Sequence, residues 1–375
     1  MDEVYNVWRY ESNEELYTND NETTIIAAAP QVSGKKFRQD YLDIVRSIPG
    51  LGIHPSIIPR IKKISEIKTE DESNPMALFD IDGFAADQTI LKCNGTMMDS
   101  TTLLTLLVVL RKYGNINTLN LSDSGLTSKS IEILAKYLPE TSITSLILDY
   151  NINIQDSCME VIASKNNSKL QSISLRGCKI NDECISKLVE VLWINGLLIE
   201  LNLFDNKITD LGGLLLAKML RYNHSISKLF LGNNQMSSST VLKFAQAVSV
   251  EYGPISSKEK EERAKVAQIQ ADNPVAGGGG GGKKKGKKGG DSAGPLRVDE
   301  MDEETNICKG NDKLKFLDLS FNGPVNDASN IKDYFSNEFT KFCESFRLLD
   351  LSNCNGIDDD LLKIISNKIN GVVEE

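Results

Sequence analysis

The apolar residues of this chain follow one short pattern that returns seven times. In each copy an apolar residue is followed, after two intervening residues, by a Leu-x-Leu core (Ile-x-Leu in the third copy), and after two more by Asn, Cys or Ser. The intervals between copies are 27, 27, 28, 28, 88 and 32 residues. A pattern that recurs at such regular intervals indicates a repeat architecture rather than chance similarity. The copies begin at Ile116, Ile143, Leu170, Leu198, Ile226, Leu314 and Phe346.

Each copy combines two periods, and together they predict the fold class. The Leu-x-Leu core alternates as a strand does, whereas the apolar residues that follow are spaced as on a helix. Helical spacing is seen at Ile131, Leu134 and Leu138, at Leu188 and Leu192, and at Leu216 and Leu220. One strand–helix unit cannot bury its apolar side alone, so the units must stack into a shared core. The pattern therefore predicts an α/β leucine-rich repeat solenoid, with parallel strands on one side and helices on the other.

The last position of each copy forms a column of small polar side chains and thiols. We expect these side chains to satisfy backbone groups at the bend that follows each strand. Because no second cluster of metal ligands accompanies them, the two cysteines in the column are given a structural role. The column consists of Ser124, Asn151, Cys178, Asn206, Asn234, Asn322 and Cys354.

One copy identifies the subclass. Residues 201–223 read LNLFDNKITDLGGLLLAKMLRYN and resemble the ribonuclease-inhibitor-like leucine-rich repeats. That resemblance covers roughly residues 88–250 and 311–372. It implies a right-handed horseshoe with the parallel sheet on the concave side and full α-helices on the convex side.

The repeats divide the chain into four predicted segments. Residues 1–87 form an N-terminal extension, in which 1–35 are expected to be disordered or loosely draped and 37–47 helical. Residues 88–251 hold an atypical cap, with a helix from Thr101 to Lys112, and five repeats. Residues 252–310 are an insertion, and residues 311–375 hold two repeats and a final helix over 358–369.

The insertion is predicted to lie outside the repeat core. It opens with SSKEKEERAKVAQIQ (256–270), a helix that either extends the preceding one or stands alone, and continues as GGGGGGKKKGKKGG (277–290). A chain so rich in glycine and charge cannot bury enough apolar surface to fold. Gly282-Lys283-Lys284 approaches a phosphate-binding loop, but it has neither the preceding strand nor the Ser or Thr that such a loop requires. The segment is therefore either a plain linker or a basic tether for acidic tubulin tails, anionic lipid or RNA, through Lys283, Lys284, Lys285, Lys287 and Lys288.

Composition excludes several functional classes. The net charge of −10 disfavours nucleic acid as the main partner, and the two histidines, His54 and His224, are expected in loops or at the surface. Seven cysteines without paired spacing indicate reduced thiols, so we expect a cytoplasmic protein without metal or cofactor. The apolar run 103–110 is too short to cross a bilayer, and no signal peptide is expected. The motif FDIDG (79–83) resembles the nucleophile loop of haloacid-dehalogenase-like phosphatases, yet the repeats leave no room for their catalytic domain.

The concave face is the predicted binding surface, because solenoids of this kind use it for partners. Phe204, Phe230 and Phe316 fall on neighbouring strands and are expected to form an exposed aromatic cluster. The alternatives are that the N-terminal extension or the insertion covers them, or that they are scattered surface residues. The predicted partner-binding set is Ile147, Asp149, Arg176, Phe204, Lys228, Phe230, Phe316 and Asp318.

The order of repeats, charged helix, lysine-rich insert and resumed repeats resembles the leucine-rich repeat-containing protein 71 family of ciliated organisms. It rests on VLKFAQAVSVEYG (241–253), KEKEERAKVAQ (258–268), GGKKKGKK (281–288) and LKFLDLSFN (314–322). The resemblance implies a non-enzymatic scaffold of the cilium or flagellum axoneme, with axonemal or tubulin-associated partners. The alternative is a GTPase-activating regulator that resembles the Ran GTPase-activating protein, although the ending GVVEE (371–375) is not the long acidic tail of that family. An innate-sensor-like or inhibitor module ranks lower, because no nucleotide domain accompanies the repeats.

Overall fold

A computed structural model describes residues 13–57, 89–154, 157–163, 169–193, 195–252, 307–323, 328–339, 341–354 and 357–370, and the short pieces 60–61, 79–80, 261, 264–265 and 268. The predicted basic tether, Lys283 to Lys288, lies outside these residues. The described chain forms two compact units, within residues 1–169 and 170–375. The boundaries of the four predicted segments, which were inferred from the spacing of the repeats, remain predictions.

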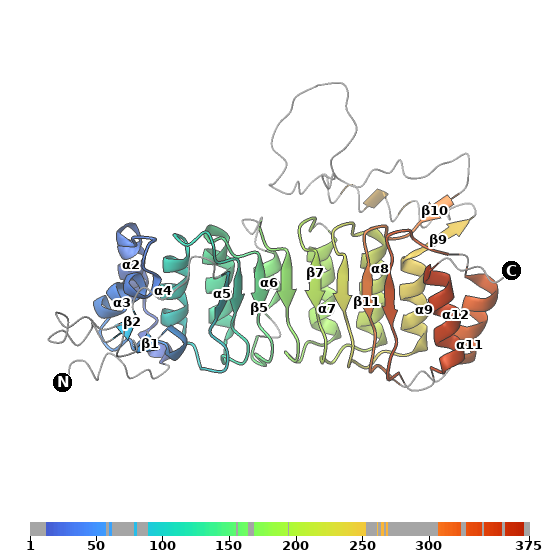
Figure 1. The fold of residues 1–375 in the computed structure, drawn as a ribbon, viewed down its shortest axis with the longest axis horizontal. Helices are drawn as coiled ribbons and strands as arrows, with labels where there is room; N and C mark the ends of the chain where they lie inside the picture. Colours follow the sequence, from blue (N-terminus) through green and yellow to red (C-terminus); the bar gives the residue numbers. More distant parts are fainter. Residues whose placement is uncertain are drawn as a thin grey trace, which may run out of the picture. The chain divides into compact units, whose positions relative to one another are not determined.

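The second unit alternates parallel strands with helices, as the two periods predicted. Its strands, in spatial order, are β6 (Ser172–Ser174), β7 (Glu200–Asn202), β8 (Lys228–Phe230), β11 (Phe316–Asp318) and β13 (Leu348–Asp350). The helices α7 (Asp182–Leu192), α8 (Asp210–Tyr222) and α9 (Ser238–Ala247) cover one face of these strands, and α11 (Ala328–Asp333) and α12 (Asp359–Asn370) follow (Figure 1). Leu201, Leu229 and Leu317 stand in register on neighbouring strands and are fully buried.

The first unit repeats the same arrangement. Its parallel strands are β3 (Ile90–Lys92), β4 (Thr118–Asn120) and β5 (Ser145–Ile147), and its helices in the repeats are α4 (Ser100–Leu110), α5 (Ser128–Tyr137) and α6 (Met159–Ala163). Strand β3 lies at the position expected for the atypical cap. The two units thus confirm an α/β leucine-rich repeat solenoid of parallel strands alternating with helices.

The polar column acts as expected, and it joins each repeat to the one before. The side-chain amide of Asn234 donates to the carbonyl oxygens of Leu203 and Leu231, both at 3.0 Å, while its oxygen accepts from the backbone N–H of Ile208 at 3.0 Å. Asn151 and Asn206 make the equivalent bonds in their repeats. Each amide therefore satisfies buried backbone groups on two consecutive turns of the solenoid, which would otherwise cost about 1–3 kcal/mol apiece.

The repeats continue directly across the insertion. Strand β11 pairs with β8 in the register Leu317 to Leu229, although 88 residues separate the two positions. Asn322 donates to the carbonyl oxygens of Leu319, in its own repeat, and of Leu231, across the insertion, at 2.9 and 3.0 Å. Both sides of the insertion therefore share one sheet.

The ends of the insertion are held side by side. Strands β9 (Ser249–Tyr252) and β10 (Ile307–Lys309) pair antiparallel, with Tyr252 opposite Ile307. Helix α9 ends at Ala247, so the predicted helix over 256–270 is not its continuation; positions 261, 264, 265 and 268 are helical, and the others lie outside the described residues. Gly310 is required at the return point, because a Cβ there would lie 2.3 Å from the carbonyl oxygen of Ala247.

The long interval of 32 residues between the last two repeats has a local cause. A π-helical turn, Tyr334–Glu338, and the short strand β12 (Lys341–Phe342) are inserted before β13. Strand β12 pairs with β9 on the side opposite to β10, giving a separate three-stranded sheet. Phe335, Phe339 and Phe342 pack together beneath it, with ring centroids 4.4 to 6.1 Å apart.

Helix α4 explains why the N-terminal extension is folded. All eleven residues of α4 are buried, because its sequence STTLLTLLVVL is apolar around most of its circumference. A helix of this kind needs cover on every side. The extension supplies it with α2 (Asn19–Ala28) and α3 (Phe37–Ser47), and Phe37 packs edge-on against Tyr113 at 5.1 Å. Residues 19–28 are therefore helical with Ile25 fully buried, rather than disordered or loosely draped as expected for 1–35; residues 1–12 lie outside the described chain.

The first unit also contains His54 and part of the FDIDG motif (79–83). His54 lies in a loop, as expected, but its side chain is fully buried, and burial lowers its pKa to about 4. In the FDIDG motif, Phe79–Asp80 forms β2, which pairs antiparallel with β1 (Arg60–Ile61); the remainder lies outside the described residues. No described helix is both long and apolar enough to span a bilayer.

A polar cluster fastens α2 to α5. Glu22 accepts hydrogen bonds from the hydroxyls of Tyr137 at 2.5 Å and Tyr17 at 2.9 Å, and from Lys136 Nζ at 2.9 Å. The bonds from Tyr137 and Lys136 lower the pKa of Glu22 to about 2. The carboxylate therefore stabilises the packing of the extension while it is ionised.

Glu22→Gln is expected to lower the free energy of unfolding by about 1 kcal/mol at pH 7. The carboxylate accepts three charge-assisted hydrogen bonds, and a neutral amide cannot replace all of them. The folded pKa is depressed, so the contribution is present above the unfolded pKa of about 4.3 and is lost as the pH falls towards 2. Denaturant unfolding at pH 7 and pH 2.5 measures this. Glu132→Gln, which removes only an exposed pair with Lys129, should change stability by less than about 0.5 kcal/mol. An equal loss for Glu22→Gln at both pH values would contradict the assignment.

Candidate functional site

Two of the three predicted phenylalanines meet on the face of the sheet opposite the helices. Phe230 ends β8 and Phe316 begins β11, and their ring centroids lie 4.9 Å apart with an interplanar angle of 43°. Because side chains alternate along a strand, both rings point away from the buried leucines at Leu229 and Leu317. Both are half-buried and present an edge to solvent.

Phe204 belongs to a second aromatic pair, just beyond the carboxyl ends of the strands. Its ring makes an edge contact with Phe321 at 6.4 Å, and the guanidinium of Arg176 lies 4.7 Å above it. The ring reaches across the neighbouring strand because that strand has no side chain at Gly232. A Cβ at Gly232 would lie 2.6 Å from the Phe204 ring.

Two exposed apolar side chains complete the surface, and the sequence-based prediction missed both. Leu348 begins β13, opposite Phe316, and is 47% exposed. Phe321 is 52% exposed. We call the surface formed by Leu348, Phe316, Phe230, Phe204 and Phe321 the apolar band. It runs from the starts of β11 and β13, over β8, to the carboxyl ends of β7 and β11.

Phe321 occupies a position that favours other residues. The residue before each member of the polar column has a positive φ, and at most of these sites it is Asp, Asn or Gly; in the second unit they are Gly177, Asp205, Asn233, Phe321 and Asn353. Phe321 has φ of 55°, a conformation that costs a bulky residue about 1–2 kcal/mol. A strained and exposed aromatic ring points to a role other than stability.

The predicted polar residues of this unit have local partners. Asp318 is only 7% exposed and accepts hydrogen bonds from the backbone N–H and hydroxyl of Ser320, at 2.8 and 2.6 Å. Burial raises its pKa, and the neighbouring carboxylate of Asp350 adds to this. Asp318 thus closes the turn after β11 and is not the exposed contact that was expected. Lys228, by contrast, is exposed and pairs with Glu200 at 3.0 Å.

The two remaining predicted residues belong to the first unit. Ile147, at the end of β5, and Asp149 are half-buried, and Tyr150 beside them is 44% exposed. The backbone carbonyl of Asp149 accepts from the N–H of Asp123 at 2.8 Å. These residues are not part of the apolar band, which belongs to the second unit.

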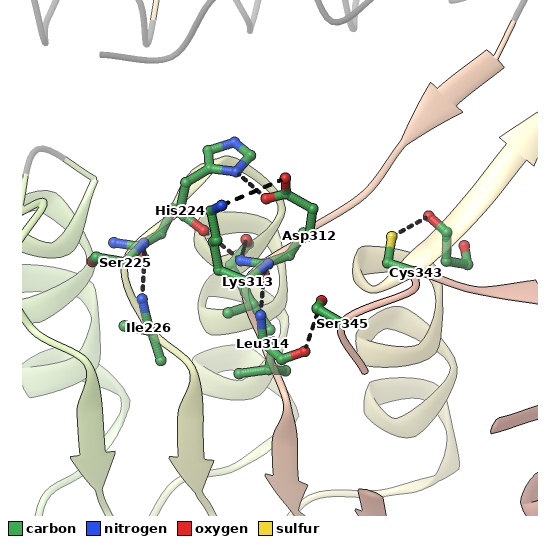
Figure 2. A network of polar contacts seen from close by, with 12 residues as sticks. His224, Ser225, Ile226, Asp312, Lys313, Leu314, Cys343 and Ser345 are labelled. Carbon is green, nitrogen blue, oxygen red and sulfur yellow. Dashed lines mark hydrogen bonds and ion pairs between the residues drawn. The ribbon is translucent and has the colours of Figure 1, made fainter. Parts of the chain in front are cut away.

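A second polar cluster, at the strand-start edge, was not predicted because its members are 88 residues apart. His224 Nδ1 lies 2.9 Å from a carboxylate oxygen of Asp312, and Lys313 is 4.0 Å from the other oxygen (Figure 2). The hydrogen bond to His224 lowers the pKa of Asp312. The hydroxyl of Ser225 donates to Asn195 and Asn223 rather than to His224, so it is not arranged as a nucleophile activated by this pair.

The same edge carries a second ladder of asparagines. Asn223 donates to the carbonyl oxygens of Leu192 and Asn195 at 2.8 and 3.1 Å. Asn311 repeats the contact across the insertion, with Leu220 at 2.7 Å and with Asn223. The His224–Asp312 pair therefore reinforces a structural seam. Within the described residues, no group of three or more His, Cys, Asp or Glu side chains is placed to hold a metal ion.

Phe321→Asn tests whether the exposed ring serves stability. Asn relieves the strain of the positive φ while the weak edge contact with Phe204 is lost, so we expect a free energy of unfolding within about 0.5 kcal/mol of the wild type, or above it. Phe335→Ala, in the buried aromatic cluster of the same unit, should cost about 3–5 kcal/mol. A loss of 2 kcal/mol or more for Phe321→Asn in denaturant unfolding would show that the ring is a packing residue.

Comparisons with known proteins agree with the repeat assignment. A family model described as "Leucine Rich repeat" matches residues 166–189 and 197–217. The protein named "Capping protein, Arp2/3 and myosin-I linker protein 3" is 27% identical in rat and 26% identical in human over 140 residues, which cover 36% of this chain. The matched stretch spans only about a tenth of those relatives' length (10%).

Among solved structures, the tropomodulin C-terminal domain of Caenorhabditis elegans is 18% identical, with a TM-score of 0.28, over 38% of this chain and 93% of that one. Leiomodin-1 actin-binding site 2 is 16% identical, with a TM-score of 0.24, over 50% of this chain and 90% of that one. Superpositions with scores this low carry no statement about function. The family model and the repeats themselves support a leucine-rich repeat family.

Proposed function

We propose that this chain is a non-enzymatic adaptor that binds a cytoskeletal protein through the apolar band of its second unit. Leucine-rich repeats imply a role in protein interaction, and the band is the observation that carries the proposal. Three large apolar side chains lie on the face of the sheet opposite the helices, and two more lie just beyond the carboxyl ends of its strands.

The composition of the band fits a binding hot spot. Interface energy concentrates in a few aromatic and arginine side chains near the centre of the contact. Here four phenylalanines and Arg176 over Phe204 supply such groups. The strain at Phe321 adds support, because stability alone would favour Asn or Gly at that position.

The cytoskeletal class of partner is supported by the sequence relatives. Their printed name describes a linker of capping protein, Arp2/3 and myosin-I, and the similarity covers part of the repeats. The resemblance to the leucine-rich repeat-containing protein 71 family supports a finer form of the proposal, in which the adaptor works at the axoneme. In either setting, Lys283, Lys284, Lys285, Lys287 and Lys288 would add a weak, salt-sensitive contact with an acidic partner.

Proximity labelling in ciliated cells tests the proposal. The full chain fused to a labelling enzyme should mark cytoskeletal proteins, and Phe230→Asp should reduce that labelling at least fivefold, because a charge in the band must be desolvated on binding. Leu211→Asp is the matched control: Leu211 is 69% exposed on α8, on the helical side, so its change should leave the labelled set intact.

The location of the fusion separates the two settings. Signal at structures that contain capping protein, Arp2/3 or myosin-I favours the partner class suggested by the relatives' name, and signal confined to the axoneme favours the ciliary partner. Cytoskeletal labelling that is unchanged by Phe230→Asp would remove the band from the account. A nuclear-rim signal with acceleration of GTP hydrolysis by Ran-type GTPases would replace the adaptor with the regulatory alternative.

A further inference from the structure

We propose that the segment bound on the apolar band is an amphipathic α-helix of about three turns, lying obliquely across β11, β8 and β7. This inference rests on the proposed function for the use of the band, and adds the conformation, length and charge pattern of the occupant.

The length follows from the path of the band. Phe316 begins β11, and Phe204 lies two strands away and four residues further along the strand direction, since Phe230 is opposite Asp318 and Asn202. Strand spacing of about 4.8 Å and a rise of about 3.3 Å per residue give a path of about 16 Å. An α-helix covers that distance with about eleven residues, or three turns.

A helix fits this face better than an extended peptide. The backbone groups of β8 are already paired on both sides, with β7 and with β11, so an arriving strand finds no free edge here. An extended peptide laid on the rings would leave its own N–H and C=O groups without partners in an apolar contact. A helix satisfies these groups internally and presents apolar side chains at i, i+3 or i+4, and i+7.

The two ends of the band carry different charges. The strand-start end carries the exposed side chains of Lys315 and Arg347. The opposite end carries both Asp205, whose carboxylate accepts from the side-chain amide of Asn233 at 2.6 Å, and the guanidinium of Arg176 over Phe204. The cations at the strand-start end favour an acidic residue on the part of the helix that lies there.

A further charge predicts one polar residue of the partner. Asp350 is half-exposed beside the band and faces the buried Asp318 in register on the neighbouring strand. The half-exposed carboxylate of Asp350 favours a Lys or Arg on the corresponding edge of the helix. The occupant is therefore an amphipathic helix with an apolar stripe, a basic residue along one border and an acidic residue at the end that lies over the strand starts.

Peptide display on the full chain tests this, with counter-selection on the Phe230→Asp variant. A library of random 16-residue peptides should yield sequences with apolar residues at i, i+3 or i+4, and i+7 and with a basic border. The synthesised peptides should gain helical circular dichroism on binding. Phe316→Asp should weaken binding at least tenfold, Asp350→Asn by a few fold, and Leu211→Asp not at all.

The outcomes separate this inference from the proposed function. Peptides of extended, alternating or proline-rich character, peptides that bind Phe230→Asp equally well, or a failure to enrich helical sequences would each overturn the helical occupant. If one of these results is obtained while Phe230→Asp still abolishes cytoskeletal labelling in cells, the adaptor function is supported and the helical occupant is contradicted. Helical peptides recovered without any loss of labelling would support the site and contradict the cytoskeletal role.

Discussion

The buried asparagine amides between consecutive repeats are the interaction on which the structure of the second unit depends. A strand–helix unit has one apolar side and a sharp bend at each end, and the bends leave backbone groups unpaired within the core. Asn206, Asn234 and Asn322 satisfy these groups on their own turn and on the preceding one. Each asparagine therefore closes the bend of its own repeat and holds the preceding repeat beside it, which keeps successive repeats in register.

This constraint explains how the chain accommodates an insertion without breaking the sheet. Asn322 makes towards Leu231 the bond that Asn234 makes towards Leu203, although the insertion intervenes in the sequence. Asn311 repeats the contact at the other edge, and the His224–Asp312 pair lies beside it (Figure 2). The apolar band lies on both sides of the insertion point, with Phe204 and Phe230 before the insertion and Phe316, Phe321 and Leu348 after it.

Much of this arrangement was predictable because it follows from local periodicity. The Leu-x-Leu cores located the strands, and the bonds of the polar column could be expected from its position at the bends. The pairing of Phe230 with Phe316 also followed, since consecutive repeats form adjacent strands and these two residues lie on the same face, two positions apart in register. What could not be predicted depends on contacts distant in sequence. The helix at 19–28 forms because it buries the apolar surface of α4. His224 contacts Asp312, which is 88 positions away in the sequence. Asp318 accepts a hydrogen bond from Ser320 at the end of its own strand instead of facing solvent. Phe321 was missed because its position, just before the polar column, holds Asp, Asn or Gly in most repeats and lies outside the strand columns that were considered.

The most direct measurement of continuity across the insertion is the stability of a chain in which residues 253–306 are replaced by Asn-Gly. Tyr252 and Ile307 are opposite each other in an antiparallel pair, so a two-residue hairpin can join them without moving either strand. If β8 and β11 are held by the repeat contacts themselves, thermal unfolding should remain a single transition within about 5 °C of the intact chain. Loss of the cooperative transition, or separate melting of the repeats before and after the junction, would contradict the account.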